Sequence, residues 1–164
     1  MSANPDYAIA DVWEDKSEDL KNEIINFWLA SEAMPRDMAL ERVDQVFCTG
    51  RDSTGRIVGV GTVYPRFNKH LENSFYVYRT FVAPDHRREL LAVNLLKFTR
   101  DRLEKEFVSG KNTRCVGMMV VVTNDQLKKY RNQAVWPHTG FVYIGKNSRG
   151  DHVRVYYFKG ARIS

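Results

Sequence analysis

The sequence has few of the residues that support several common classes of protein. Cysteine occurs twice in 164 residues, at Cys48 and Cys115, each within an apolar, strand-like segment. Buried free thiols are therefore expected rather than a disulfide. Cysteine and histidine do not recur at metal-ligand spacing, so no metal site is expected. No apolar run approaches the ~20 residues of a membrane span and the N-terminus lacks a signal-peptide layout, which predicts a soluble, cytoplasmic protein that does not associate with membranes.

Positive charge exceeds negative charge. The 25 Lys and Arg residues against 20 Asp and Glu give a formal net charge of +5, which favours an anionic partner. A nucleotide-like cofactor, a nucleic acid or a solvated surface without a specific partner would each account for this charge. With 43% hydrophobic and 12% aromatic residues, the chain has the composition of a packed globular protein. Its length predicts a single domain, 1–164.

One stretch, from Ser74 to Phe107, combines a strand, a basic turn and a helix. Its first part is rich in β-branched and aromatic residues as far as Pro84, which cannot donate a backbone hydrogen bond and so closes the strand. From Glu89 onward, apolar residues recur every three or four positions, as on one face of an amphipathic helix. The N-terminus of a helix offers unpaired N–H groups and a positive dipole end, so this turn is suited to binding an anion.

The basic turn resembles a known motif. The run from Val82 to Ala92 is similar to the acyl-CoA-binding motif Arg/Gln-x-x-Gly-x-Gly/Ala of the GNAT N-acetyltransferase superfamily. The first and last motif positions match at Arg87 and Ala92, whereas Leu90 stands where the family usually has glycine. In the family, backbone N–H groups of this loop hold the pyrophosphate of the cofactor, and glycine permits its close approach.

The order of elements along the chain also resembles this superfamily. Composition and periodicity predict a polar connection at 65–73, strands at 7–13, 45–49, 56–64, 74–82, 114–123, 141–146 and 152–158, and helices after Ser17 and at 36–43, 89–107 and 125–130. The resemblance implies a mixed α/β (α+β) fold, the GNAT-like acyl-CoA N-acyltransferase fold, in a single domain. Such a fold has a mainly antiparallel sheet, helices on both faces and a central parallel strand pair that splays apart.

The resemblance implies a function and a set of cofactor contacts. The function is transfer of an acetyl or other acyl group from acetyl-CoA, or another acyl-CoA, to an amine on a small molecule or peptide. The pantetheine arm would pair with the backbone of Phe81 and Val82 and lie beside Asn124. The pyrophosphate would be held by the loop residues Arg87, Arg88, Glu89, Leu90, Leu91 and Ala92.

Three residues are candidates for proton transfer. In the resembled family the general acid is commonly a tyrosine on the helix after the second central strand, and Tyr130 occupies such a helix. His138 is a second candidate because an imidazole exchanges protons near neutral pH. Glu72, which precedes the central strand, is the candidate base.

Two other functions stay open. A GNAT-like domain that has lost CoA binding, or that uses another acyl donor, would account for Leu90 in the glycine position. A basic nucleic-acid-binding module is less favoured, because the basic residues are scattered and no aromatic stacking motif accompanies them. Those residues are Arg87, Arg88, Lys128, Lys129, Arg131, Arg149 and Arg154. A homodimer through the C-terminal hairpin is a further expectation.

Overall fold

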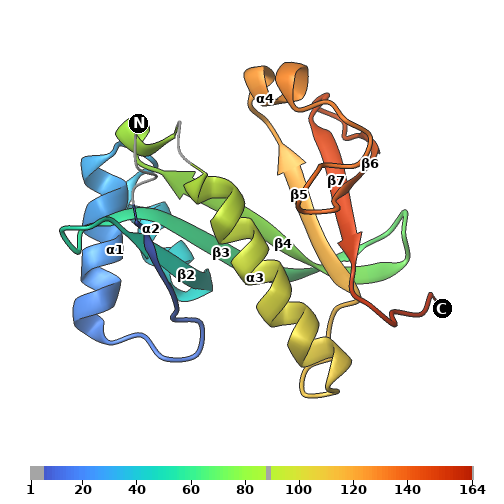
Figure 1. Cartoon of the computed structure of the whole chain (residues 1–164), viewed down its shortest axis with the longest axis horizontal. Coiled ribbons are helices and arrows are strands. Elements are labelled where there is room, and N and C mark those ends of the chain that lie inside the picture. The colour runs from blue at the N-terminus through green and yellow to red at the C-terminus, as the bar shows by residue number, and fades with distance from the viewer. Residues whose placement is uncertain (1–5, 88–89, 164) are drawn as a thin grey trace. The chain divides into compact units, whose positions relative to one another are not determined.

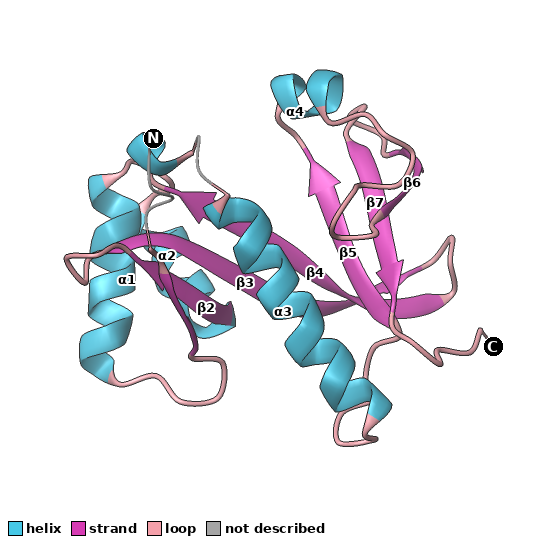
Figure 2. Ribbon diagram, viewed as in Figure 1, coloured by secondary structure: helices cyan, strands magenta, loops and turns pink. Residues whose placement is uncertain are grey.

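The computed structural model describes residues 6–87 and 90–163. Its strands form one mixed sheet in the order β1-β2-β3-β4-β5-β7-β6. Figures 1 and 2 show the elements, which in chain order are β1 (Ala8–Asp11), α1 (Glu18–Ala30), α2 (Arg36–Arg42), the 3-10 helix η1 (Val43–Gln45), β2 (Val46–Arg51), β3 (Ile57–Asn68), β4 (Asn73–Val82), the 3-10 helix η2 (Pro84–His86), α3 (Leu91–Val108), β5 (Gly117–Val122), α4 (Asp125–Tyr130), β6 (Val142–Lys146) and β7 (His152–Tyr157).

The chain divides into two compact units. The first comprises Met1–Val63 and Thr80–Thr99, and the second comprises Tyr64–Arg79 and Arg100–Ser164. Three long elements, β3, β4 and α3, contribute residues to both units. The single domain expected from the length of the chain stays a prediction.

The sheet contains the parallel pair that was predicted. Strands β4 and β5 run parallel, in a register that extends from Phe75 opposite Gly117 to Tyr78 opposite Val120. The pairs β1–β2, β2–β3, β5–β7 and β6–β7 are antiparallel. These pairings confirm the mixed α/β fold class. The splay of β4 from β5 beyond Tyr78 stays a prediction, because β4 there enters the first unit.

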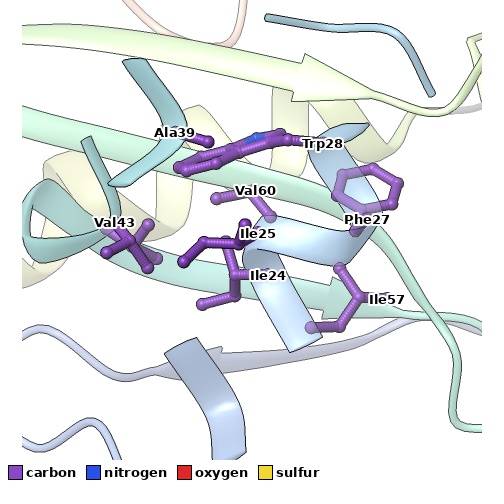
Figure 3. Close-up of a cluster of buried hydrophobic side chains, with 9 residues drawn as sticks. Ile24, Ile25, Phe27, Trp28, Ala39, Val43, Ile57 and Val60 are labelled. Atoms are coloured by element: carbon purple, nitrogen blue, oxygen red, sulfur yellow. The ribbon is translucent and has the colours of Figure 1, made fainter. Parts of the chain in front are cut away.

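In the first unit, α1 and α2 cover one face of β2 and β3. Figure 3 shows the buried cluster that joins them, in which Trp28 and Ile24 of α1 lie with Ala39 of α2 and with Ile57 and Val60 of β3. Helix α1 begins after Ser17, whose side chain accepts a hydrogen bond from the backbone N–H of Leu20 at 3.1 Å. The helix cap predicted from the sequence is therefore confirmed.

The N-terminal half of α3 covers the other face of the same strands. Gly59 of β3 leaves room for α3, since a Cβ atom there would lie 2.9 Å from Leu95 Cδ1 and 3.1 Å from Leu91 Cδ2. Close to these residues, the thiol of Cys48 lies 3.4 Å from Thr99 Oγ1. The first unit thus has the helices on both faces that the resemblance implied.

In the second unit, the residues of β5 alternate between two packed faces. Met119 packs with Phe75 of β4 and Val155 of β7 in a small buried cluster. On the opposite face, Tyr156 of β7 donates a hydrogen bond to the carboxylate of Glu104 on α3 at 2.8 Å. Helix α4 follows β5 directly and is six residues long.

Two expectations about individual segments have clear outcomes. The expected connection at 65–73 is wrong in its first part, because β3 continues through Pro65 to Asn68. Proline already has a φ angle close to that of an extended chain, and it is excluded only where a strand needs its missing N–H donor. Both cysteines are buried and free, as predicted. Burial raises the pKa of both the Cys48 and Cys115 thiols to about 11.

Two features are absent from residues 6–87 and 90–163. No helix there has the length and apolarity needed to cross a bilayer. Within the same residues, no group of three or more His, Cys, Asp or Glu side chains is placed to hold a metal ion.

Candidate functional site

The basic turn follows β4 in the first unit. At the end of β4, the N–H of Ala83 donates to Val58 O of β3 at 2.8 Å. The chain then turns through η2, with Pro84 in its first turn and the N–H of His86 donating to Ala83 O at 2.9 Å. Beyond the turn, the N–H of Asn94 donates to Leu90 O at 2.9 Å, which is the first hydrogen bond of α3 among the described residues. The turn therefore leads into a helix N-terminus, as the sequence predicts.

Arg87 lies back along the end of β4. Its Nε donates to Val82 O at 3.0 Å, and its guanidinium carbon lies 5.3 Å from the centre of the Phe81 ring. The side chain is exposed. Val82, whose backbone was expected to pair with pantetheine, therefore accepts a hydrogen bond from Arg87 in this structure.

The residues at the start of α3 differ sharply in exposure. The side chain of Leu90 is 60% exposed, whereas Leu91 is fully buried against β2 and β3. Ala92 is half-buried. Leu91 anchors the first turn of the helix, and Leu90 points away from that core. Arg88 and Glu89, which were predicted to contribute to the same loop, lie outside the described residues.

Asn124 and Tyr130 mark the two ends of α4 in the second unit. The side-chain oxygen of Asn124 accepts hydrogen bonds from the N–H groups of Gln126 and Leu127 at 2.9 and 3.1 Å. Asn124 is therefore the N-cap of α4, as its position in the sequence predicts. Tyr130 is 66% exposed, and the Lys129 ammonium lies 5.4 Å from its ring centre.

His138 lies in the segment that follows α4. Its backbone has a φ of 70°, which is unusual for a residue with a side chain. Arg100 of α3 holds this backbone in place, because its Nη1 donates to the carbonyl oxygens of His138 at 3.2 Å and Thr139 at 2.7 Å. The His138 side chain itself is exposed.

Glu72 lies away from the other candidate residues of the second unit. It occupies the exposed turn before β4, with a φ of 53°. Because β4 and β5 are parallel, Glu72 lies near the N-terminal ends of the pair, whereas Asn124 follows the C-terminal end of β5. At ~3.3 Å per strand residue, these two ends are about 20 Å apart. The structure therefore does not bring Glu72 together with Asn124.

Arg154 of β7 is a candidate that the sequence alone presents only as one basic residue among several. The side chain is 1% exposed, and its Nη2 donates to Arg131 O at 3.1 Å. Neither Nε nor Nη1 has a hydrogen-bond partner in residues 6–87 and 90–163. Burial lowers the pKa of this guanidinium. An arginine in the middle of the apolar strand at 152–158 is the sequence signal that could have identified it.

Comparisons with known proteins decide the fold. No protein-family model and no curated protein matches the sequence. Solved structures do match: a GNAT-family acetyltransferase from Streptococcus pneumoniae (TM-score 0.61, 12% identity, covering 93% of this chain and 99% of that one) and a ribosomal-protein alanine acetyltransferase from Vibrio fischeri (TM-score 0.62, 12% identity, 95% of each chain). A GNAT-family acetyltransferase from Brucella melitensis, in complex with acetyl-CoA, also matches (TM-score 0.55, 13% identity, 96% of this chain and 91% of that one).

The protein has the GNAT fold. Within it, the described residues predicted for cofactor binding or for proton transfer, apart from Glu72, fall into two groups. One group lies around the end of β4 and the start of α3 in the first unit and comprises Phe81, Val82, Arg87, Leu90, Leu91 and Ala92. The other group lies in or beside α4 in the second unit and comprises Asn124, Tyr130 and His138. Anion binding by the first group and proton exchange by the second stay predictions.

Proposed function

We propose that the protein transfers an acetyl or another acyl group from acyl-CoA to an amine. The observation that supports this function best is the combination of the GNAT fold with an arginine-containing loop at the start of α3. Unpaired N–H groups and the positive end of the helix dipole favour a pyrophosphate at such a position. The three structural neighbours named above are acetyltransferases, and the one from Brucella melitensis is in complex with acetyl-CoA.

In this proposal, the loop and the end of β4 bind the cofactor. Arg87, Arg88 and the backbone N–H groups of the residues from Glu89 to Ala92 neutralise the pyrophosphate. The backbone of Phe81 and Val82 would hydrogen-bond the pantetheine amides, and the Val82 carbonyl, which accepts one bond from Arg87, has a second lone pair for this.

The chemical step needs an amine that has lost its proton and a donor for the leaving thiolate. The amine nitrogen attacks the thioester carbonyl carbon, the C–S bond breaks, and the departing sulfur takes a proton. Tyr130 is the proposed donor of this proton, with His138 as the second candidate. The proton lost by the amine passes to water. Because Glu72 lies at the other end of the β4–β5 pair, this proposal gives it no role.

Binding of acetyl-CoA tests this function. A ligand at about 100 times its dissociation constant stabilises a protein by roughly 2.7 kcal/mol, which is visible as a higher thermal midpoint. The double substitution Arg87→Ala with Arg88→Ala is expected to abolish the rise. Arg56→Ala is the matched control, because Arg56 is an exposed arginine of the first unit outside the loop. A rise that survives the double substitution contradicts the proposed site.

Longer acyl-CoAs distinguish the proposed function from its main alternative, a GNAT-like domain that does not bind CoA. If neither acetyl-CoA nor a longer acyl-CoA raises the midpoint, the protein is a GNAT-like domain that has lost CoA binding or uses another donor. Leu90→Gly then tests whether the side chain at the usual glycine position is the obstacle, since the substitution should restore binding.

A homodimer through β6 and β7 and a cytoplasmic location stay predictions. Strand β6 lies at the edge of the sheet, where two copies could pair.

A further inference from the structure

We propose that Arg154 is the anchor for a carboxylate, and that the amine acceptor is a small amino acid. This inference rests on the proposed function, because it names the acceptor class for the same reaction. It starts from the guanidinium of Arg154, which is buried in the second unit without any acidic partner among the described residues.

Most of the hydrogen-bonding capacity of Arg154 is unused. A guanidinium carries five N–H donors. One, on Nη2, is directed to Arg131 O at 3.1 Å. The N–H on Nε and both on Nη1 are buried and have no hydrogen-bond partner in the part of the chain that the structure describes. A buried charge that lacks both an ion pair and its hydrogen bonds is costly. A bound anion would supply both.

Two aromatic rings restrict where that anion can lie. The guanidinium carbon is 4.4 Å from the centre of the Trp136 ring and 5.8 Å from that of Tyr143. Rings at these distances stabilise the cation but do not replace the missing hydrogen-bond acceptors. The missing partner is therefore an acceptor that meets the N–H groups themselves, as a carboxylate does in a forked pair with arginine.

The surroundings favour one negative charge over two. In the sheet, Arg154 pairs with Val120 of β5 on one side and with Tyr143 of β6 on the other, so its lateral neighbours are uncharged. His152 and Tyr156 lie on the same face of β7, two residues away in each direction. One buried guanidinium balances a carboxylate, whereas a phosphate dianion would leave a charge uncompensated.

The segment that covers Arg154 connects it to the proposed chemistry. This cover segment runs from Arg131 to Gly140 and is held by Trp136, whose indole Nε1 donates to Arg131 O at 2.8 Å. Arg131 follows Tyr130 directly, so the Arg154 guanidinium is hydrogen-bonded to the residue next to Tyr130, the proposed proton donor. His138 belongs to the cover segment, as does Thr139, whose buried hydroxyl also has no partner. Both proton-transfer candidates thus belong to the cover segment or directly precede it, as suits a short acceptor that carries an amine and a carboxylate.

Access to Arg154 requires the cover segment to move. The first five residues of the segment, 131–135, are exposed, and backbone bonds from Trp136 N to Phe141 O and from Tyr143 N to Ala134 O hold its two sides together, both at 2.8 Å. Trp136 would then leave the guanidinium as the ligand enters. Its indole is a built-in reporter of this step.

Binding of matched acids and amides tests the anchor. Calorimetry and tryptophan fluorescence are measured without any acyl donor, using the common amino acids and their amides, which differ only in the carboxylate. We expect at least one amino acid to bind at least tenfold more tightly than its amide, with a fluorescence change that disappears in Trp136→Phe. Acetate, which has the carboxylate but no amine, separates the anchor from recognition of the amine. Equal binding of acid and amide, or no binding by any amino acid, overturns the proposal.

Variants of Arg154 locate the binding. Arg154→Met is expected to abolish the preference for the acid, and Arg154→Lys to keep the charge but weaken binding at least tenfold, because lysine lacks the fork. A preference that survives in Arg154→Met overturns the proposal. Acetyl-CoA binding by the same variants verifies folding and separates the two claims. A wild-type protein that binds acetyl-CoA but does not discriminate acids from amides refutes the anchor alone, whereas discrimination without acetyl-CoA binding refutes only the proposed transfer.

Discussion

Two arginines on strands, one in each unit, have opposite environments. Arg51 of β2 is partly exposed and pairs with Glu23 of α1 through two hydrogen bonds, of 2.6 and 2.8 Å, and a third bond links it to Gly55 O at 2.8 Å. Arg154 of β7 is buried and has one hydrogen bond to the described residues, which Arg131 O accepts. The arginine that water can solvate thus has an ion pair and three hydrogen bonds, whereas the buried arginine has neither an ion pair nor more than one hydrogen bond within the described chain.

The difference separates an arginine that supports the fold from one that is incomplete without a ligand. An ion pair near the surface, such as Arg51–Glu23, adds a small amount of stability, and its charges need no further partner. A buried guanidinium with too few partners lowers the free energy of unfolding. A ligand that pairs with it would offset this loss. The contrast is testable with variants of each unit.

The largest expected effect is the loss of stability when a Cβ atom is added at a tightly packed glycine, which we compare between one glycine in each unit. A Cβ atom added at Gly117 of β5 would overlap the carbonyl oxygen of Tyr156, a backbone atom of β7 that cannot move without breaking the β5–β7 ladder. Gly117→Ala should lower the free energy of unfolding by more than about 3 kcal/mol. Gly59→Ala meets only the ends of two leucine side chains and should cost about 1–3 kcal/mol. Urea unfolding of both variants checks the order; equal losses would contradict it.

The next effect concerns Arg154 itself and has the opposite sign. Arg154→Met removes the underpaired charge and keeps much of the side-chain volume, while Arg131 O still accepts from Trp136. Without ligand, the free energy of unfolding should stay the same or rise by up to about 2 kcal/mol. Denaturant unfolding at neutral pH measures it. If the free energy of unfolding instead falls by more than about 2 kcal/mol, the contacts with the aromatic rings alone compensate for the burial of the charge.

Removing the Arg51 guanidinium should lower the free energy of unfolding by less than the glycine substitutions do, and this loss should depend on pH. The hydrogen bonds from Arg51 lower the pKa of Glu23 in the folded protein. The stabilisation is therefore present above the unfolded pKa of about 4.3 and is lost as the pH falls through the lower folded value. Arg51→Met should cost about 1 kcal/mol at pH 7, and this difference from the wild type should shrink below about pH 4. Glu23→Gln is the control and should lose the same pH dependence.

Much of the fold could be predicted from local patterns. The period of three to four in α3 reflects the burial of Leu95 and Leu103 on one face, and the cap of α1 at Ser17 follows from side-chain chemistry one turn away. The extent of β3 could not be predicted in this way. Its continuation through Pro65 depends on which backbone groups the neighbouring strands need, and that pairing is not encoded locally.

The site was less predictable than the fold. The turn before α3 and the cap at Asn124 have local signatures, and the structure contains both. The separation of Glu72 from Asn124 follows from the parallel pairing of β4 with β5, a contact between segments far apart in sequence. The environment of Arg154 likewise depends on Trp136 of the cover segment and Tyr143 of β6, which approach it only in the folded chain.

The smallest expected effects come from the two helix caps, which compare the local stability of the units. Ser17→Ala removes the cap of α1, whose buried residues tie it to the core, so the loss of about 0.5–1 kcal/mol should appear in global unfolding. Asn124→Ala removes two hydrogen bonds, but α4 has no buried residue among those described and can fray alone. Its global loss should be only a few tenths of a kcal/mol, while amide exchange accelerates in α4. If Asn124→Ala instead destabilises the whole protein as much as Ser17→Ala does, α4 is coupled to the core, and the cover segment that follows it opens less readily than the carboxylate anchor requires.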